Sequence, residues 1–315
     1  MPDVAGGGHI GFLLESTHGT YIAPTQFAPV ESESLQEVRS DPKRVPILGQ
    51  AVTQGKVKGR EHVAGDITME LLPEVHVYFM IASRWGNNLA KSGVGPYVYT
   101  LNDDAAAHVK TNYRSLTIVA DRGGIGFAYL GCQVTSHRIF FEDGIPKVTY
   151  SIIGRGQSED YTPGAVTAPT EVPFGADEVA VTVAAGARTD LDSLEFSFDD
   201  NGEPQFNLDG NEAASYVKFG EFVGEASYEI DFEDKSDYAI WVARTTQEVK
   251  CTLTKSANQI VVVEIHGGLY NAFEVGLAGL GDQVRAAATV EAAYVSGDTA
   301  AAEQVITTDE NVTIA

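Results

Sequence analysis

Apolar and polar positions alternate along much of the chain, which is the pattern of half-buried β-strands. Helical spacing occurs at two places, within residues 73–85 and 233–246, where apolar residues recur on one helical face. The pattern therefore predicts a mostly β chain with two short helices. The strands are expected at residues 10–14, 34–38, 56–72, 116–121, 127–141, 147–153, 194–198, 216–232, 250–254, 259–265 and 286–295.

Changes in composition divide the chain into segments. The central stretch has three prolines and few large apolar residues, a composition that is typical of a linker. The first residues are rich in Gly, Pro and Thr, which favours an extended arm. Residues 87–113 are expected to form a long loop with a hairpin at 97–101. The predicted division is an N-terminal arm at 1–30, a first domain at 31–155, a linker at 156–178, a second domain at 179–297 and a flexible C-terminal tail at 298–315.

The two halves repeat a pattern at an offset of 159 in the sequence numbering. VAGDITMEL at residues 63–71 matches FVGEASYEI at 222–230 in the order glycine, acid, apolar, hydroxyl, bulky, Glu, aliphatic. Ser34-Leu35 matches Ser193-Leu194 at the same offset, and Tyr78 matches Tyr238 at an offset of 160, inside the predicted helix of each half. Alternating segments can align by chance, but one offset kept over several features favours an internal duplication.

Acidic residues outnumber basic ones. The chain has 44 Asp and Glu against 21 Lys and Arg, which gives a formal net charge of −23. Such a surface repels a polyanion, so tight nucleic-acid binding is not expected, although weak repulsive contact with DNA remains open. The alternative is that the charge only keeps the protein soluble.

No pattern in the sequence indicates an enzyme, a cofactor site or a metal site. The seven histidines form no H-E-x-x-H motif, and there is no G-x-S-x-G, P-loop or dinucleotide-binding fingerprint. Cys132 and Cys251 have no metal-type spacing and are expected to be buried, as in a protein that folds in a reducing cytoplasm. We expect no secretory signal, because the first Lys or Arg is Arg39 and residues 5–11 are rich in glycine. We expect no membrane-inserted segment, because no apolar run approaches the length needed to cross a bilayer.

Several short motifs occur in an order that resembles the major tail-tube proteins of long, flexible-tailed bacteriophages. The resemblance covers roughly residues 5–295, and no single motif is diagnostic. The motifs are GGG at 6–8, APT at 23–25, ESESL at 31–35, GDITME at 65–70 before the first helix, GCQV at 131–134 and SLEFSFDDN at 193–201.

The resemblance implies two tandem β-sandwich or barrel-like domains, each with one flanking helix. It also implies assembly: six such domains form a ring, rings stack into a hollow tube, and the genome passes through it into the host. With two domains per chain, a trimer with pseudo-sixfold symmetry is the preferred ring, and a hexamer is the alternative. The implied partners are further copies of the chain, a tape-measure protein in the lumen, tail terminator and tail-tip proteins, and double-stranded DNA in transit.

The resemblance places the protein in the virion tail, after synthesis and assembly in the host cytoplasm. It also gives the acidic strands a role. Alternation puts Asp66 and Glu70 on one face of the first repeated strand, and Glu225, Glu229 and Asp231 on one face of its counterpart. In a DNA conduit this face would line the lumen, whereas in an ordinary sheet it would be the solvated outer face.

Other β-rich phage proteins remain alternatives, namely a capsid decoration protein or a tail terminator or adaptor. Under the tail-tube interpretation, the N-terminal arm and residues 87–113 would reach toward the next ring.

Overall fold

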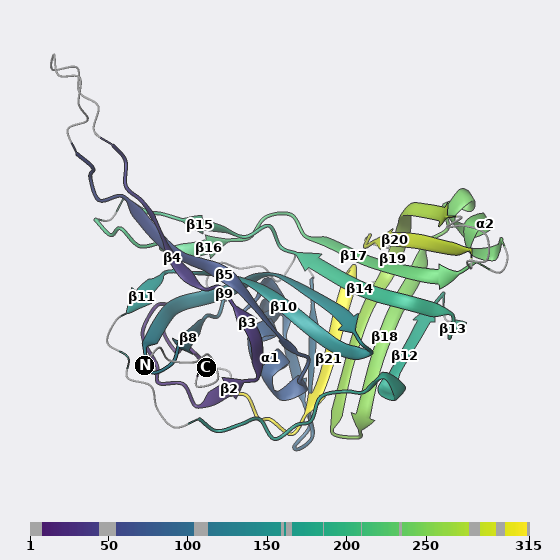
Figure 1. The fold of residues 1–315 in the computed structure, drawn as a ribbon, viewed down its shortest axis with the longest axis horizontal. Helices are drawn as coiled ribbons and strands as arrows, with labels where there is room; N and C mark the ends of the chain where they lie inside the picture. Colours follow the sequence, from purple (N-terminus) through teal and green to yellow (C-terminus); the bar gives the residue numbers. More distant parts are fainter. Residues whose placement is uncertain are drawn as a thin grey trace, which may run out of the picture.

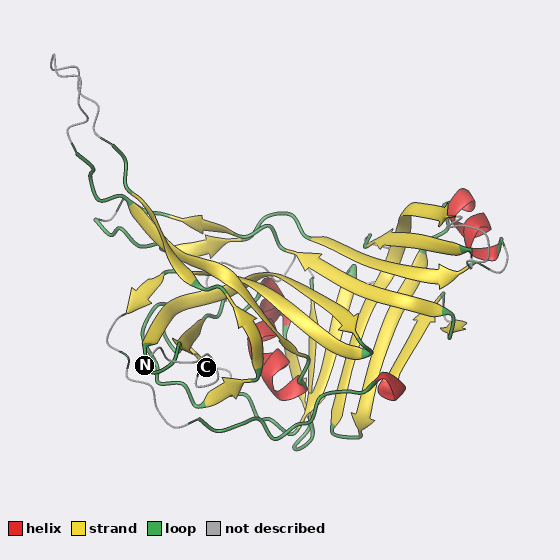
Figure 2. Ribbon diagram, in the orientation of Figure 1, coloured by secondary structure: helices red, strands yellow, loops and turns green. Residues whose placement is uncertain are grey.

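The computed structural model describes residues 8–43, 55–103, 113–158, 161, 166–184, 186–208, 210–232, 235–276, 284–293 and 300–313. The protein is mostly β, with antiparallel pairing between its strands (Figure 2). Nineteen of these strands are connected by pairing into one array, which consists of three sheets that share β9 and β19, and the remaining two strands form a separate hairpin (Figure 1).

One sheet runs through both halves of the chain, and we call it the spanning sheet. Its strands, in spatial order, are β3 (Val30–Glu33) with β4 (Gln36–Ser40), β5 (Arg60–Glu70), β10 (Ile145–Gly154), β9 (Gly126–Glu142), β14 (Leu191–Asp199), β17 (Val223–Asp231), β20 (Arg285–Glu291) and β19 (Gln259–Gly276).

The other two sheets each belong mainly to one half. The first contains β2 (Gln26–Ala28), β1 (His9–Leu14), β8 (Leu116–Asp121), the N-terminal part of β9 and β11 (Gly156–Ser158). The second contains β13 (Gly186–Arg188), β12 (Val179–Val183), β18 (Gln247–Ser256), the N-terminal part of β19, β21 (Ala302–Thr308), β7 (Tyr97–Asn102) and β6 (Ala90–Ser92). The hairpin is β15 (Glu203–Gln205) with β16 (Tyr216–Lys218).

The two α-helices differ in burial. Helix α1 (Pro73–Ile81) begins on the predicted proline and lies between the halves, where it contacts β9 of one half and β19 and β21 of the other. Helix α2 (Ser236–Ala243) follows β17 and keeps every residue at least partly exposed. Two short 3₁₀ helices, η2 (Arg84–Asn88) and η5 (Ala176–Glu178), complete the set of described helices.

The strand pairing repeats between the halves. In the first half β1 pairs with β8, β8 with β9, β9 with β10, β10 with β5, and β5 with β3 and β4. In the second half β12, β18, β19, β20, β17 and β14 pair in the same order. Helix α1 follows β5, as α2 follows β17. The same topology therefore occurs twice in the chain.

Paired hydroxyls locate the register of the repeat. The hydroxyls of Thr68 and Thr149 lie 2.9 Å apart across β5 and β10, and those of Ser227 and Thr289 lie 3.1 Å apart across β17 and β20. Thr68 and Ser227 thus occupy equivalent places in the two repeats. Their numbers differ by the offset that the sequence pattern indicates for these strands.

The neighbouring strand does not keep that offset. Ser32 lies opposite Thr68 and Glu195 lies opposite Ser227, so Ser32 and Glu195 are the equivalent pair on this strand. Matching Leu35 with Leu194 is therefore wrong, because on this strand the register in the structure is shifted by four residues, or two apolar–polar periods, from the register that the sequence pattern suggests. An alternating strand matches another at any even shift, so the sequence pattern alone does not distinguish these registers.

The ends of the chain differ from the segments expected there. Within residues 1–30, expected to be an extended arm, β1 and β2 pair with each other, and β1 also pairs with β8. Within residues 298–315, expected to be a flexible tail, β21 pairs with β19 and β7. Residues 97–101, where a hairpin is expected, form a single strand, β7, which pairs with β6 on one side and with β21 on the other. Backbone hydrogen bonding to neighbouring strands orders these segments despite their polar composition.

Candidate functional surface

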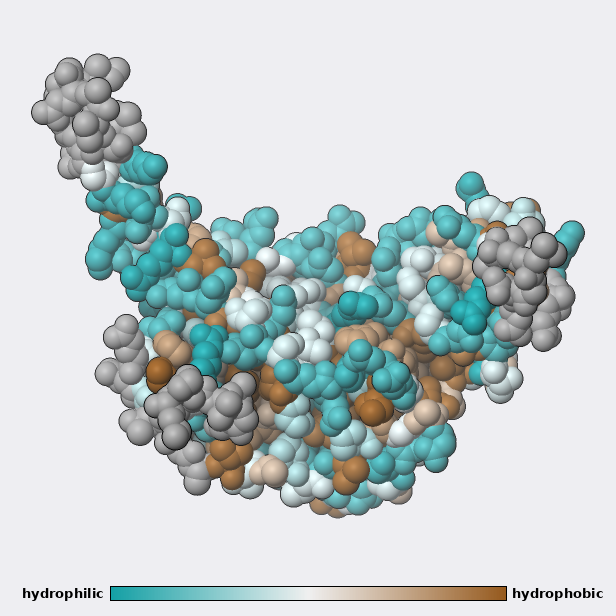
Figure 3. All heavy atoms as spheres, in the orientation of Figure 1, coloured by the Kyte–Doolittle hydropathy of each residue, from teal (hydrophilic) through white to brown (hydrophobic). Residues whose placement is uncertain are grey.

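The five acids singled out from the sequence lie on one face of the spanning sheet. Along β5, Asp66 and Glu70 alternate with the buried Ile67 and Met69. Along β17, Glu225, Glu229 and Asp231 alternate with the buried Ala226, Tyr228 and Ile230. We call this side of the sheet the acidic face. In Figure 3, hydrophilic residues follow the upper margin of the molecule, where β14 and β17 lie in Figure 1.

The acids are spread over the face and do not form a cluster. Three strands lie between β5 and β17, so four strand-to-strand spacings of about 4.8 Å place these two strands about 19 Å apart. Asp66 accepts a hydrogen bond of 2.7 Å from the Ser151 hydroxyl, and Glu225 lies directly opposite Glu291. Like charges that face each other across strands destabilise a sheet, so this placement is costly for folding alone.

Three basic residues on the acidic face form ion pairs with neighbouring carboxylates. Arg138 on β9 contacts Glu195 on β14 at 2.6 Å. Lys147 on β10 contacts Glu142 at 2.5 Å and Glu31 at 2.8 Å, and hydrogen bonds to these carboxylates raise the pKa of the lysine. Arg285 on β20 contacts Asp192 at 2.9 Å. These pairs hold the positive charges near the sheet, so the face presents excess negative charge.

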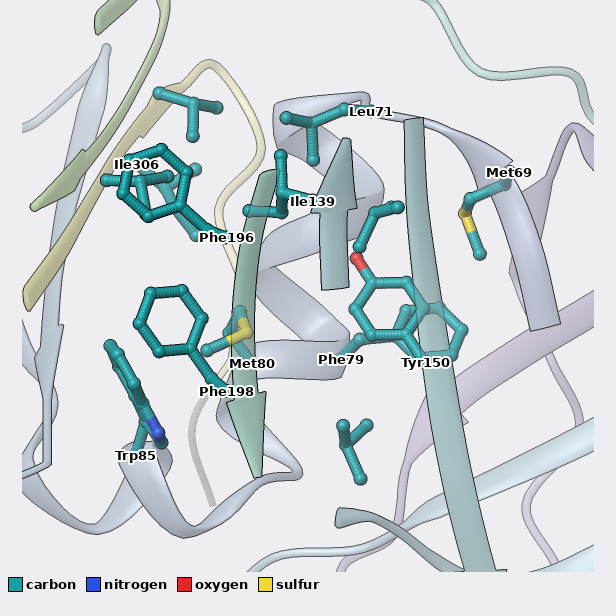
Figure 4. Close-up of a cluster of buried hydrophobic side chains, with 14 of the residues drawn as sticks. Met69, Leu71, Phe79, Met80, Trp85, Ile139, Tyr150, Phe196, Phe198 and Ile306 are labelled. Atoms are coloured by element: carbon teal, nitrogen blue, oxygen red, sulfur yellow. The ribbon is translucent and has the colours of Figure 1, made fainter. Parts of the chain in front are cut away.

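The two halves meet at a seam between β9 and β14, where residues 136–140 pair with residues 195–199. Under this seam, Phe198 of the second half packs against Trp85 and His137 of the first, with ring centroids 5.1 and 4.9 Å apart. Figure 4 shows Phe198 beside Trp85. The seam thus joins the two repeats through both backbone pairing and an aromatic core.

A chain of buried polar groups crosses the same seam. His76 on α1 lies 2.5 Å from the Tyr150 hydroxyl and 2.8 Å from Oε1 of Gln304 on β21, and Nε2 of Gln304 lies 2.7 Å from Nε2 of His137. Gln304 Oε1 can only accept, so His76 carries its proton on Nε2 and accepts from Tyr150 through Nδ1. Burial lowers the pKa of His76 to about 4 and that of His137 well below its usual value.

The described residues contain no group of three or more His, Cys, Asp or Glu that could hold a metal ion. Both cysteines are free and buried, and burial raises the pKa of Cys251 to about 12, which makes its thiol unreactive. None of the helices in the described ranges is long and apolar enough to cross a membrane.

The family model for phage tail tube proteins matches residues 7–312. The chain belongs to the phage tail tube protein family. No curated protein matches it. Membership makes the chain a structural protein of the virion tail. For a tail tube protein, whose role is self-assembly, the relevant features are extended surfaces and exposed strand edges.

The alternation of polar and apolar residues predicts the acidic strands of this tail tube protein but not its seam. The seam depends on pairing between β9 and β14, which are separated in the chain by the strands β10 to β13. A usable signal was present in the alternation of Phe196 and Phe198 with polar residues, because a strand with large aromatics on one face needs a partner surface to cover them.

Proposed function

We propose that this tail tube protein polymerises as rings that stack into the hollow tube of a long, flexible phage tail. The observation that carries the proposal is the spanning sheet, in which two repeats form one continuous sheet with acid on a single face. A ring of such sheets closes into a barrel and removes the exposed strand edges.

The acidic face would line the lumen of the tube. Double-stranded DNA has about one negative charge per 1.7 Å of helix axis, so a wall of like charge gives phosphates no group to bind. The pairing of Arg138, Lys147 and Arg285 with carboxylates supports this role, because free basic side chains would hold DNA in place. The tube would then guide the genome from the virion into the host.

Two repeats per chain support a ring of three chains with pseudo-sixfold symmetry. Before ejection a tape-measure protein would occupy the lumen, and terminator and tip proteins would close the two ends. Assembly would take place in the host cytoplasm.

Electron microscopy of the purified protein tests this function. We expect tubes with a central channel, three chains per ring, and Asp66 and Glu229 on the channel wall. Six chains per ring would support the hexamer instead. Dispersed particles at every concentration would contradict the tube and favour a decoration or terminator protein, and tubes with these acids on the outer surface would refute the lumen assignment.

A further inference from the structure

Each of the two strands of the internal seam has a counterpart at one end of the spanning sheet, and this counterpart has no seam partner among the described strands. The C-terminal part of β9 pairs with β10 on one side and β14 on the other. Its counterpart, the stretch 269–276 of β19, pairs with β20 on one side, and no described strand pairs with its other side. Likewise, β14 pairs with β17 and β9, whereas its counterparts β3 and β4 pair, among the described strands, with β5 alone.

We propose that consecutive chains in a ring join by repeating the internal seam, so that β19 of one copy pairs antiparallel with β3 of the next. This inference rests on the proposed function and specifies its contact surface. The partner is a second copy of this chain, because each copy carries both halves of the joint.

The paired hydroxyls of the two repeats give the register. Arg138 lies opposite Thr149 and Ala272 lies opposite Thr289, so Ala272 corresponds to Arg138. On the other strand, Ser32 corresponds to Glu195, because they lie opposite Thr68 and Ser227. Inside the chain Glu195 pairs with Phe140 and Ser197 with Arg138. Between copies, Ser32 therefore faces Glu274, Glu33 faces Phe273 and Ser34 faces Ala272.

A hollow beside each acceptor strand supports this joint. In the second repeat, a hollow of about 370 Å³ next to β14 is lined by Val179, Val181 and Leu194 together with Phe141 and Gly144, which the first repeat contributes from the end of β9 and its turn. In the first repeat, a hollow of about 540 Å³ lies next to β3, lined by His9, Ile10, Ala28, Val30, Glu33 and Arg122.

The side chain that would complete the wall of the hollow beside β3 is exposed at the other end of the spanning sheet. Val275 corresponds to Phe141 and has 44% of its surface exposed. In the joint it would line the hollow beside β3 of the next copy, as Phe141 lines the hollow beside β14. Exposed apolar side chains beside a free strand edge are typical of an interface that is covered after assembly.

Helix α2 also lacks the covering surface that its counterpart α1 has within the chain. Tyr78 and Ala82 of the first repeat are buried, and the helix α1 to which they belong contacts β19 and β21 of the other half. Their counterparts Tyr238 and Val242 are 40% and 61% exposed. A second copy at this end would cover α2, as the second repeat covers α1.

Cysteine cross-linking in assembled tubes tests the joint. The variant Ser32→Cys with Glu274→Cys places two thiols on directly opposed positions, within reach of a disulfide or a short bis-thiol reagent. After oxidation and denaturation we expect a ladder of one, two and three chains. The pair Ser34→Cys with Ala272→Cys should give the same ladder and serves as an independent second variant.

Two controls make the result specific. Arg138→Cys with Ser197→Cys forms the equivalent pair inside one chain, so it should cross-link without a gain in mass. Ser32→Cys with Leu269→Cys is out of register by several residues and should give no ladder. Tubes in which neither in-register pair cross-links would overturn the joint but leave the tube function intact. Failure of the unmodified protein to form tubes would instead contradict the proposed function.

Discussion

At the scale of single residues, the exposed acids of the acidic face carry a prediction about DNA. Glu229→Lys replaces an exposed carboxylate on β17 by a cation. We expect tubes of this variant to retain double-stranded DNA that the unmodified tubes release, with binding that weakens as salt rises, by a slope of about 0.9 per phosphate contacted. Co-sedimentation of tubes with short duplexes, at about 50 and about 200 mM salt, measures this.

The matched control is Asp309→Lys, which makes the same change in net charge at an exposed residue that lies after β21, outside the spanning sheet. It should leave DNA release unchanged. If both variants bind DNA equally, the position of the charge on the acidic face has no importance and only total charge matters.

His76 carries a second prediction at this scale. In the folded protein its pKa is about 4, below the ordinary 6.5, so the unfolded chain takes up a proton first as pH falls. Its contribution to stability is complete above pH 6.5 and is lost toward pH 4, which amounts to about 3 kcal/mol. Asp200 and Glu171, whose pKa burial raises to about 8 and about 7, act in the opposite direction.

The contributions of Asp200 and Glu171 to the free energy of unfolding cancel when the unmodified protein is compared with His76→Gln, because both proteins contain these two groups. We expect the stability advantage of the unmodified protein over the variant to shrink by about 3 kcal/mol between pH 7 and pH 4, as measured by urea denaturation. His62→Gln, at a ring that is only partly buried, serves as the control and should give a smaller change. An advantage that is constant with pH would show that His76 titrates normally.

At the scale of elements, the strand β14 holds the two repeats together, and Phe198 is its main anchor. This side chain is 1% exposed and packs on Trp85 from the other half. Phe198→Ala should lower the free energy of unfolding by about 3–5 kcal/mol, since it removes a large buried ring. Val223→Ala, at an exposed position on β17, should change it by about 0.5 kcal/mol or less. Equal effects in chemical denaturation would mean that the seam adds nothing to stability.

The sequence was sufficient for the elements whose burial follows a simple period. The strand β5 and both helices lie within the ranges that alternation and helical spacing predict, since one face of the strand is apolar. The range 216–232, predicted as one strand, contains β17 but also the separate strand β16. β21 could not be predicted in this way. Its inward residues include Gln304 and Thr308, which are buried because His76, His137 and Glu171 provide hydrogen bonds from distant parts of the chain. Polar residues with distant partners look like a solvated tail in sequence.

At the scale of the whole molecule, the spanning sheet has an exposed strand edge at each of its two ends. One end of the spanning sheet presents β3 and β4, and the other presents β19 and the exposed helix α2. The internal seam has the Arg138–Glu195 ion pair, whereas the corresponding residues of the joint between copies are Ala272 and Ser32, which carry no charge. The joint between copies should therefore be weaker, and each chain should fold before rings form.

The net charge of −23 then controls how readily rings form. Joining chains brings acidic faces together, and their repulsion extends over a Debye length of about 30 Å at 0.01 M salt but only about 10 Å at 0.1 M. Burial of Val275 and α2 favours association at either concentration, because it removes apolar surface from water. Raising NaCl from about 10 to about 150 mM should therefore speed tube growth, which light scattering would follow. Combining Glu225→Gln with Glu229→Gln should speed growth at low salt and flatten this dependence, whereas growth that slows with added salt would indicate that ion pairs between copies, and not apolar contacts, hold the ring together.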